Sequence, residues 1–345
     1  MAPRSRVAPL TETAGHDLLR TGAALVSHAD RGTVRVTGAE RASWLQGLLS
    51  NDIEALTPGR GCYAAWLTPQ GRMLTDAVVL AEDDALTVSL PAPLVDALLR
   101  QLNAAIFAED VLLTDESAEW RTLGVHGVRA AEVVARSLTG SRPSDAALTV
   151  EHLATWTEYT HAPLEPFGRI VGASPYGVPG FRLCVRADDA DPWMSRLRLA
   201  GATLTPADAL EFARIESGRP QFLVDMDADT IPLEAGIEDR AISFTKGCYV
   251  GQEVIVRIVH RGGGRVVRKL VGLVIDGECV PTARAGVKAE KGEIGRVTSS
   301  AWSPRLGAAV ALAYVHRDSA EPGTAVRVAC DGGEVEATVR AFPLA

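Results

Sequence analysis

The spacing of hydrophobic residues predicts a chain that mixes helices with strands. Residues 33–38 alternate hydrophobic and polar side chains, as a half-buried strand does, whereas residues 39–52 repeat hydrophobic side chains at helical spacing. Two hydrophobic runs within residues 62–81 are separated by turn residues that include Pro69 and Gly71, which predicts a hairpin. The N-terminal part of the chain is therefore predicted to run strand, helix, hairpin.

Residues 86–201 predict a second unit with two strand–helix–strand sets in series. Short strands alternate there with helical segments such as 93–107 and 128–138. This order indicates an antiparallel sheet covered on one face by two helices, a ferredoxin-like plan. After it, residues 206–220 predict a helix that ends near Gly218.

The pattern changes again after the glycine run at 262–264. Residues 265–345 consist of short β-branched runs separated by glycines, and the pair Gly332 and Gly333 is typical of a hairpin turn. We therefore predict a small C-terminal β-barrel, with the glycine run as the linker into it.

Composition narrows the class of protein. A length of 345 residues is enough for two or three domains, and a net charge of −8 argues against general nucleic-acid binding. No hydrophobic run approaches the roughly 20 residues that a membrane span needs, and the first residues lack the hydrophobic core of a signal peptide. We expect a cytoplasmic protein without a nucleic-acid or membrane partner.

The cysteines are scattered, with no C-x-x-C pair and no Cys/His spacing typical of a metal site. We therefore expect no structural zinc and no iron–sulfur cluster held by this chain. An odd number of separated thiols in a cytoplasmic protein also argues against a disulfide framework. Cys62, Cys184 and Cys330 have hydrophobic neighbours and are expected to be small core residues. Cys279 is expected to have no role.

The fifth cysteine, Cys248, lies in a basic stretch of an otherwise acidic chain. Hydrophobic residues from Val250 to Val259 fall on one helical stripe, which predicts a helix with Cys248 at or just before its start. The dipole of that helix and the charge of Lys246 would favour the thiolate. Six Lys or Arg residues against one Glu between Lys246 and Lys269 indicate an anionic ligand or an acidic partner. Equally, Cys248 could be a buried loop thiol and the arginines a solvated helix face.

The segment KGCYVGQE, residues 246–253, resembles the signature of the folate-binding YgfZ family, whose relatives include the aminomethyltransferase of the glycine cleavage system. The motifs RIESG (214–218) and IPLEAG (231–236) precede it in the order of that superfamily. The resemblance implies an α+β chain whose three domains form a clover-leaf around a tetrahydrofolate pocket. It also implies a role in making or maintaining iron–sulfur enzymes, with client enzymes or assembly proteins as partners and Cys248 as the functional thiol.

The same resemblance divides the chain into three predicted domains. Residues 20–85 and 202–264 would form a discontinuous folate-binding domain, residues 86–201 the ferredoxin-like domain, and residues 265–345 the β-barrel domain.

Candidate site residues follow from the resemblance and from the chemistry of folate. The pterin ring carries N–H donors that a carboxylate can accept, which makes Glu234 the first candidate and Asp76 the second. The glutamate tail needs a cation. The candidates are Cys248 and Lys246 for catalysis, and Glu234, Asp76, Arg257, Arg214, Arg240 and Tyr249 for folate binding. Asp76 could instead face solvent in its hairpin, the arginines could be ordinary surface charges, and Trp44 and Trp66 could form either an aromatic slot or core.

Two other functions remain open from the sequence. The aminomethyltransferase tends to carry two adjacent aspartates where this chain has Thr75 and Asp76, and one fewer carboxylate weakens the stabilisation of charge on a transferred group. That folate-dependent enzyme is therefore the alternative. The third function is a folate-free scaffold for protein contacts.

Overall fold

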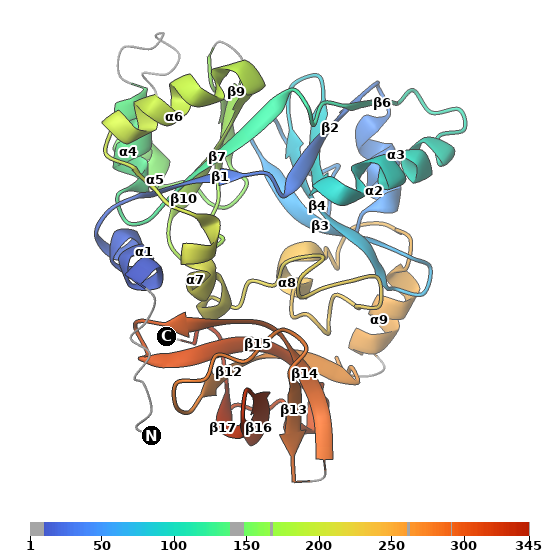
Figure 1. Cartoon of the computed structure of the whole chain (residues 1–345). Helices are drawn as coiled ribbons and strands as arrows, with labels where there is room; N and C mark the ends of the chain where they lie inside the picture. The colour runs from blue at the N-terminus through green and yellow to red at the C-terminus, as the bar shows by residue number, and fades with distance from the viewer. Residues whose placement is uncertain (1–9, 139–147, 166–167, 261–262, 291, 345) are drawn as a thin grey trace.

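The structure is a computed structural model, and it describes residues 10–138, 148–165, 168–260, 263–290 and 292–344. Two sheets with their helices and one closed barrel surround a middle region of short helices (Figure 1). The expected α+β, three-domain clover-leaf is confirmed.

The first sheet has five antiparallel strands in the order β3-β4-β5-β2-β6. Its strands are β2 (Arg31–Thr37), β3 (Gly61–Leu67), β4 (Met73–Ala81), β5 (Leu86–Pro91) and β6 (Leu112–Asp115). Helices α2 (Arg41–Leu48) and α3 (Val95–Ala104) share a hydrophobic core with it, and Trp44 and Trp66 belong to that core. The predicted strand, helix and hairpin are confirmed here, and the two tryptophans pack in the core.

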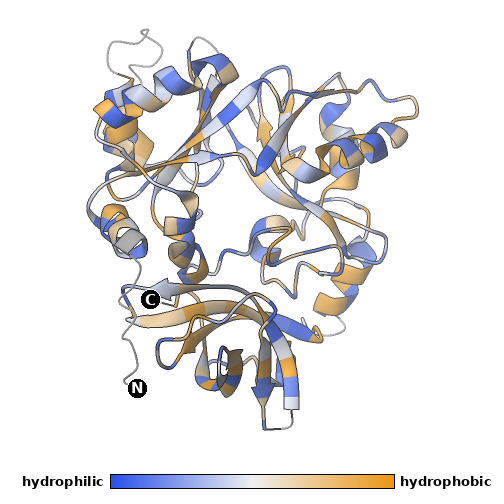
Figure 2. Ribbon diagram, in the orientation of Figure 1, coloured by the Kyte–Doolittle hydropathy of each residue, from blue (hydrophilic) through white to orange (hydrophobic). Residues whose placement is uncertain are grey.

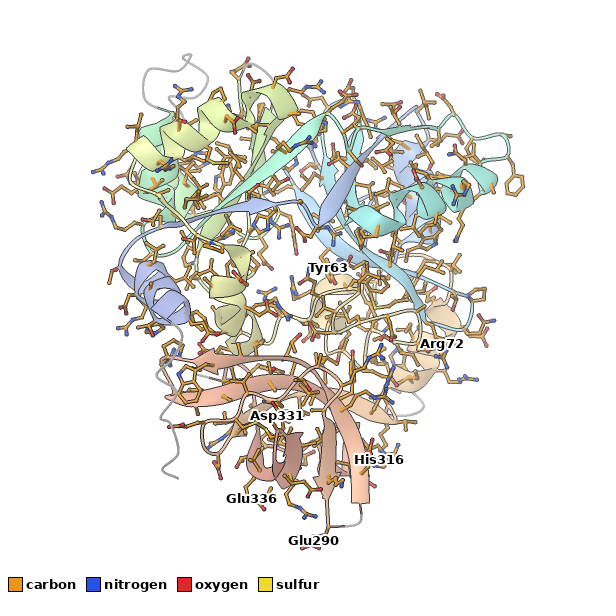
Figure 3. The ribbon with its side chains drawn as sticks, in the orientation of Figure 1. Tyr63, Arg72, Glu290, His316, Asp331 and Glu336 are labelled. Atoms are coloured by element: carbon orange, nitrogen blue, oxygen red, sulfur yellow. A yellow bond between two sulfur atoms is a disulfide. The ribbon has the colours of Figure 1, made fainter. Side chains whose placement is uncertain are left out.

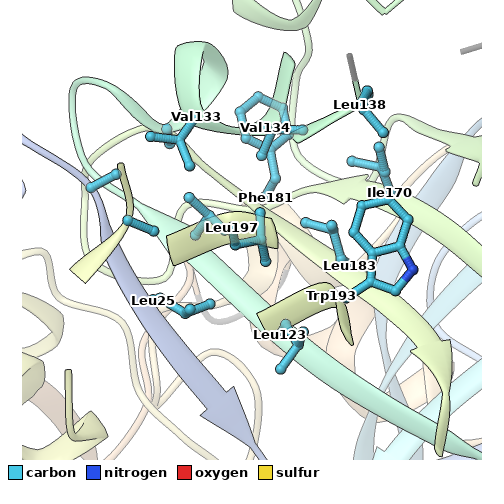
Figure 4. Close-up of a cluster of buried hydrophobic side chains, with 14 of the residues drawn as sticks. Leu25, Leu123, Val133, Val134, Leu138, Ile170, Phe181, Leu183, Trp193 and Leu197 are labelled. Carbon is cyan, nitrogen blue, oxygen red and sulfur yellow. The ribbon is translucent and has the colours of Figure 1, made fainter. Parts of the chain in front are cut away.

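The second sheet has six strands in the order β11-β1-β7-β10-β9-β8. Its strands are β1 (Ala24–His28), β7 (Trp120–His126), β8 (His161–Pro163), β9 (Gly168–Gly172), β10 (Gly180–Arg186) and β11 (Thr203–Leu204). Its helices are α4 (Ala130–Ser137), α5 (Val150–Ala154) and α6 (Ala190–Leu199). The helices and one sheet face enclose the core around Phe181 and Leu183 (Figure 4). The order β7-α4-β9-β10-α6-β11 is ferredoxin-like, with β1 inserted between β11 and β7.

The sheets do not follow the domain boundaries predicted from the sequence. Strands β5 and β6, predicted within 86–201, pair with β2 of the first sheet, whereas β1 pairs with β7 and β11 of the second. Local patterns identify a strand by its own residues, but its sheet is decided by partners far away in sequence.

The C-terminal barrel is closed in the order β12-β15-β14-β13-β16-β17. Its strands are β12 (Arg268–Ile275), β13 (Gly286–Ala289), β14 (Gly292–Ser303), β15 (Ala308–His316), β16 (Ala325–Cys330) and β17 (Gly333–Arg340). Hydrophobic and hydrophilic residues alternate along β14 (Figure 2), whereas β15 is buried on both faces because it lies between the barrel core and the rest of the molecule. The predicted barrel is confirmed.

The expectation of no disulfide is wrong. Cys279 and Cys330 are joined by a disulfide, with their Cα atoms 6.4 Å apart. Cys279 follows β12 and Cys330 ends β16, and 51 positions separate them in sequence. Closure of the barrel brings the two together, which residue spacing alone does not reveal. Cys330 is thus neither free nor a simple core residue, and Cys279 has a structural role.

The short helices α7 (Glu211–Glu216) and α8 (Glu238–Ala241) lie in the middle of the molecule, between the sheets and the barrel (Figure 1). Helices α1 (Leu10–Thr21) and α9 (Gln252–His260) lie to either side of them. Short 3-10 helices are η1 (Ala92–Leu94), η3 (Ala187–Asp189), η4 (Ala207–Leu210) and η5 (Arg317–Ser319). The helix predicted after Cys248 is confirmed as α9, although it begins four residues after the cysteine. Among the described helices, none is long and hydrophobic enough to cross a membrane.

Candidate functional site

A central cavity of about 450 Å³ lies between the two sheets and helices α7 and α8. Tyr63, on β3, lies close to the point where the three parts of the molecule meet (Figure 3). A smaller chamber of about 60 Å³ adjoins the cavity, and the two share lining residues that include the charged or titratable side chains His28, Asp30, Arg31 and Arg182. A cavity of this size falls within the range of small-molecule sites, about 300–1,000 Å³.

Asp76 lies in the cavity wall and is not a solvent-facing hairpin residue. Its side chain is buried, and it accepts hydrogen bonds from Arg31 Nη1 at 2.8 Å and from the Tyr63 hydroxyl at 3.1 Å. Burial raises the pKa of Tyr63 well above its usual value, so the hydroxyl stays protonated and donates. Asp76 is therefore held in a fixed orientation with capacity for further donors.

Arg240, also predicted, lies on α8 and lines the cavity. Its Nη2 donates to the Tyr159 hydroxyl at 3.1 Å and lies 3.5 Å from a carboxylate oxygen of Glu158, which also pairs with Arg219 at 3.1 Å. The guanidinium carbon lies 5.0 Å from the centre of the Tyr63 ring. Arg240 thus forms part of a charged and aromatic wall.

Arg214, the third predicted residue in the cavity wall, has no donor left for a ligand. Its five N–H groups reach the Glu211 carboxylate, the Arg219 carbonyl, the Asp225 carboxylate at 2.7 Å and the Ser299 hydroxyl at 2.8 Å. Ser299 belongs to barrel strand β14, so Arg214 fastens α7 to the barrel.

The rest of the RIESG motif serves the same attachment. Glu216 accepts a hydrogen bond from Ser303 of β14, and the Leu344 N–H donates to the Glu216 carbonyl at 2.7 Å. Gly218 has a φ of 68°, and a Cβ there would clash with the Phe342 ring. The motif connects the barrel to the cavity wall.

The remaining predicted folate contacts lie outside the cavity lining. Glu234 is buried against Arg268 of β12, with Oε2 3.0 Å from Nε, and its carbonyl accepts from the Leu270 N–H at 2.7 Å. Arg257 is exposed on α9, and Tyr249 is buried beside Lys246. The structure therefore brings together Asp76, Arg214 and Arg240 but separates them from the other three.

Lys246 caps the C-terminal end of helix α2. Its ammonium donates to the carbonyls of Gln46 and Leu49 at 2.6 Å each and to that of Asn51 at 2.9 Å. Burial lowers the pKa of Lys246 to about 8. The lysine holds the loop that carries the motif, and its charge is directed into the end of α2.

Cys248 lies on the surface of that loop. The residue is exposed, and it is not among the residues that line the central cavity. This exposure excludes the alternative of a buried loop thiol. The helix expected to start at or just after the cysteine begins only at Gln252, because the chain first turns at Gly251, whose φ is 84°. Cys248 and the cavity are separate features.

Two family models match this chain, one over the two sheets and their helices, which together form the body of the molecule, and one over the barrel. Residues 8–246 match the GCVT N-terminal domain, and residues 268–345 match the glycine cleavage T-protein C-terminal barrel domain. The chain belongs to the glycine cleavage T-protein family.

Relatives in this T-protein family span nearly the whole chain. An aminomethyltransferase of Saccharopolyspora erythraea is 31% identical over 96% of this chain and 89% of its own length, and one of Rubrobacter xylanophilus is 32% identical over 88% and 78%. The aminomethyltransferase T structure from Bartonella henselae covers 98% of this chain and 90% of its own, with a TM-score of 0.85 at 20% identity. The last comparison shows a shared fold.

Aminomethyltransferases of the T-protein family bind tetrahydrofolate. The cavity suits this molecule because it offers a buried carboxylate on Asp76, tyrosine side chains for ring contact and cations at its wall. Sequence analysis missed Arg31, Tyr63 and Arg182. Arg31 and Tyr63 lie on strands of the first sheet and Arg182 lies on a strand of the second, so only the arrangement of the two sheets in the folded chain shows that all three line one cavity. The described residues contain no cluster of three His, Cys, Asp or Glu side chains that could hold a metal ion.

Proposed function

We propose that this chain is a cytoplasmic tetrahydrofolate-binding accessory protein that supports iron–sulfur cluster assembly or repair in client enzymes. Its place in the T-protein family and the cavity around Asp76 support folate binding. The resemblance of residues 246–253 to the YgfZ signature supports the accessory role. The observation that carries the proposal is that this loop is fastened by Lys246 and presents Cys248 to solvent.

The cavity residues would hold and orient the cofactor. Asp76, fixed by Arg31 and Tyr63, accepts N–H groups of the pterin, and Tyr63, Tyr159 and Tyr176 offer ring faces and hydroxyls. Arg240 and Arg219 place positive charge at the same wall. Tetrahydrofolate, when bound, supplies the capacity to carry a one-carbon unit.

Cys248 would act toward a partner protein rather than inside the cavity. A lone thiol can exchange with a disulfide or be oxidised, but it cannot hold a cluster by itself. Arg257 and the neighbouring basic residues would favour an acidic surface on that partner. Client enzymes or assembly proteins are the proposed partners.

A deletion strain provides the test. Wild-type protein should restore the activities of iron–sulfur enzymes, whereas Cys248→Ser should fold, bind folate and fail to restore them. Cys62→Ala is the matched control, because Cys62 is also a free thiol but is half-buried at the edge of the first core. Full complementation by Cys248→Ser would overturn the accessory role.

The alternative function is aminomethyl transfer, which the names of the relatives at 28–32% identity favour. Against it, Thr75 is buried and its hydroxyl donates to the Asp76 carbonyl, so only one carboxylate occupies this pair of positions. Purified protein, aminomethylated lipoyl carrier and tetrahydrofolate should give no methylenetetrahydrofolate above background. Sustained release of ammonia and product would establish the alternative.

A further inference from the structure

Two glycines open a polar notch in the cavity face of the second sheet. Gly124 of β7 lies opposite Arg182 of β10, and Gly180 lies opposite His126. A Cβ at Gly124 would lie 2.5 Å from Nε2 of both His28 and His126. The absence of side chains at the glycines therefore makes room for two imidazoles beside Arg182.

Arg182 differs from the other arginines that line the cavity. Arg31, Arg214, Arg219 and Arg240 each have a carboxylate oxygen within 3.5 Å. Within the described ranges, no hydrogen-bond or ion-pair partner lies within reach of Arg182, and its Nε is buried without one. A buried donor without a partner is costly, so a cation in this position indicates an acceptor that a ligand brings.

A carboxylate that lines the same part of the cavity as Arg182 decides which kind of acceptor fits. Asp30 also lines both the cavity and the inner chamber, and its Oδ1 lies 3.7 Å from Nδ1 of His28. Burial lowers the pKa of His28, so this imidazole is neutral near pH 7. Burial alone would raise the pKa of Asp30, but His28 and the charge of Arg182 lower it below its usual value, and the carboxylate is ionised.

Arg182 and Asp30 thus face the same end of the cavity, where Arg31 is already paired with Asp76. Their charges cancel, which disfavours a carboxylate of the ligand at this position because Asp30 would repel it. A neutral group that carries a carbonyl oxygen next to an N–H satisfies both side chains, since Arg182 donates and Asp30 accepts.

We propose that Arg182 and Asp30 bind the cyclic amide edge of the ligand, with Arg182 donating to the ring carbonyl oxygen and Asp30 accepting from the adjacent ring N–H. This inference rests on the proposed function, because the reduced pterin of tetrahydrofolate has such an edge. It places the pterin ring at the inner end of the cavity, with the glutamate tail toward the other arginines.

The test is calorimetric titration of purified protein with three probes, under anaerobic conditions. The probes are tetrahydrofolate, 6-methyltetrahydropterin, which lacks the tail, and p-aminobenzoylglutamate, which lacks the ring. Arg182→Leu should weaken tetrahydrofolate and the reduced pterin about tenfold or more and leave p-aminobenzoylglutamate unchanged. Arg182→Lys should recover part of the affinity. Arg186→Leu is the matched control, because Arg186 is on the same strand but does not line the cavity.

Thermal melting of the free protein completes the test. Arg182→Leu should melt no lower than wild type, because it removes a cation without a partner. Wild-type affinity of Arg182→Leu for tetrahydrofolate would overturn this inference alone, as would a loss confined to p-aminobenzoylglutamate, which would assign Arg182 to the tail. If wild-type protein binds none of the three probes, the proposed function fails and the inference with it.

Discussion

At the scale of single residues, the free thiols differ in what surrounds them. Cys248 is exposed, whereas Cys62 and Cys184 are half-buried, and burial raises the pKa of Cys62 to about 12. Cys184 lines the inner chamber, with Sγ 3.8 Å from the Thr122 hydroxyl. A thiol reacts as the thiolate and only where a reagent can reach it. Exposure therefore makes Cys248 on the surface more accessible to a reagent than Cys184 in the chamber.

We expect limiting iodoacetamide near neutral pH to alkylate Cys248 before Cys62 and Cys184. Because Cys248 lies outside the cavity and Cys184 lines its chamber, bound tetrahydrofolate should slow labelling of Cys184 and leave that of Cys248 unchanged. Peptide mapping by mass spectrometry gives the rates. Folate protection of Cys248 would show that the thiol and the cofactor are coupled after all.

Asp76 and Glu234, the two carboxylates predicted to bind folate, should respond differently to substitution. Asp76→Asn should weaken tetrahydrofolate binding by about 1.5–3 kcal/mol, because it removes a charged acceptor from the cavity. Glu234→Gln should leave affinity unchanged and lower thermal stability, because Glu234 pairs with Arg268 of the barrel. Calorimetry and thermal melting of both variants measure this. The opposite pattern would return Glu234 to the folate site.

At the scale of elements, strand β7 lies between β1 and β10, and this pairing buries the side chain of its residue His126. Burial lowers the pKa of His126 well below its usual value, so the unfolded chain binds its proton first as pH falls. The stabilising effect of keeping His126 neutral is complete above the unfolded pKa of about 6.5 and is lost as pH falls below it. His126→Phe should therefore flatten the loss of stability between about pH 7 and pH 5. Urea denaturation at a series of pH values tests this, and His28 and His161, whose pKa values burial also lowers, account for a residual slope.

The barrel strands are held together by one covalent link in addition to their hydrogen bonds. Reducing the disulfide between Cys279 and Cys330 should lower the stability of the barrel by about 2–4 kcal/mol, because the unfolded chain regains conformational freedom. Thermal melting with and without a strong reductant measures the effect. Cys279→Ala is the control and should melt like the reduced wild type, with no further response to reductant.

At the scale of the whole molecule, Arg214 and its partners connect the barrel to the body. Asp225 accepts from Arg214, Thr298 and Ser299, and its side chain is fully buried. Arg214→Met should cost about 3–5 kcal/mol, because it leaves the Asp225 charge buried without its partner. Calorimetry should then show the barrel melting separately from the body. Arg129→Met, which breaks an exposed pair with Glu132, should change little and serves as the control.

How far the sequence predicts this molecule depends on the range of the interaction. The hairpin around Gly71, helix α2 and the barrel hairpin at Gly332 follow from local patterns and are confirmed. The pairing of β1 with β7 and the disulfide depend on contacts made only after the chain folds. Family motifs located the right segments, yet Lys246 and Glu234 fasten one segment to another outside the cavity lining. Arg214 lies in the cavity wall, but its donors bind α7, the following loop and the barrel. A motif marks a position under constraint without saying whether packing or ligand imposes it.

The insertion of β1 between β11 and β7 has a consequence for synthesis. Ala24 pairs with His126, about 100 residues further along the chain, and with Thr203 beyond it. A ribosome that adds roughly 5–20 residues each second needs on the order of 5–20 s to reach β7. Until then Ala24–Val26, buried in the finished protein, has two unpaired edges that another nascent chain could join. The first sheet can form meanwhile, because its last strand ends at Asp115. The nascent chain therefore passes through a stage in which the first sheet is folded while β1 of the second sheet is still unpaired, and this is the stage at which a chaperone would be needed most.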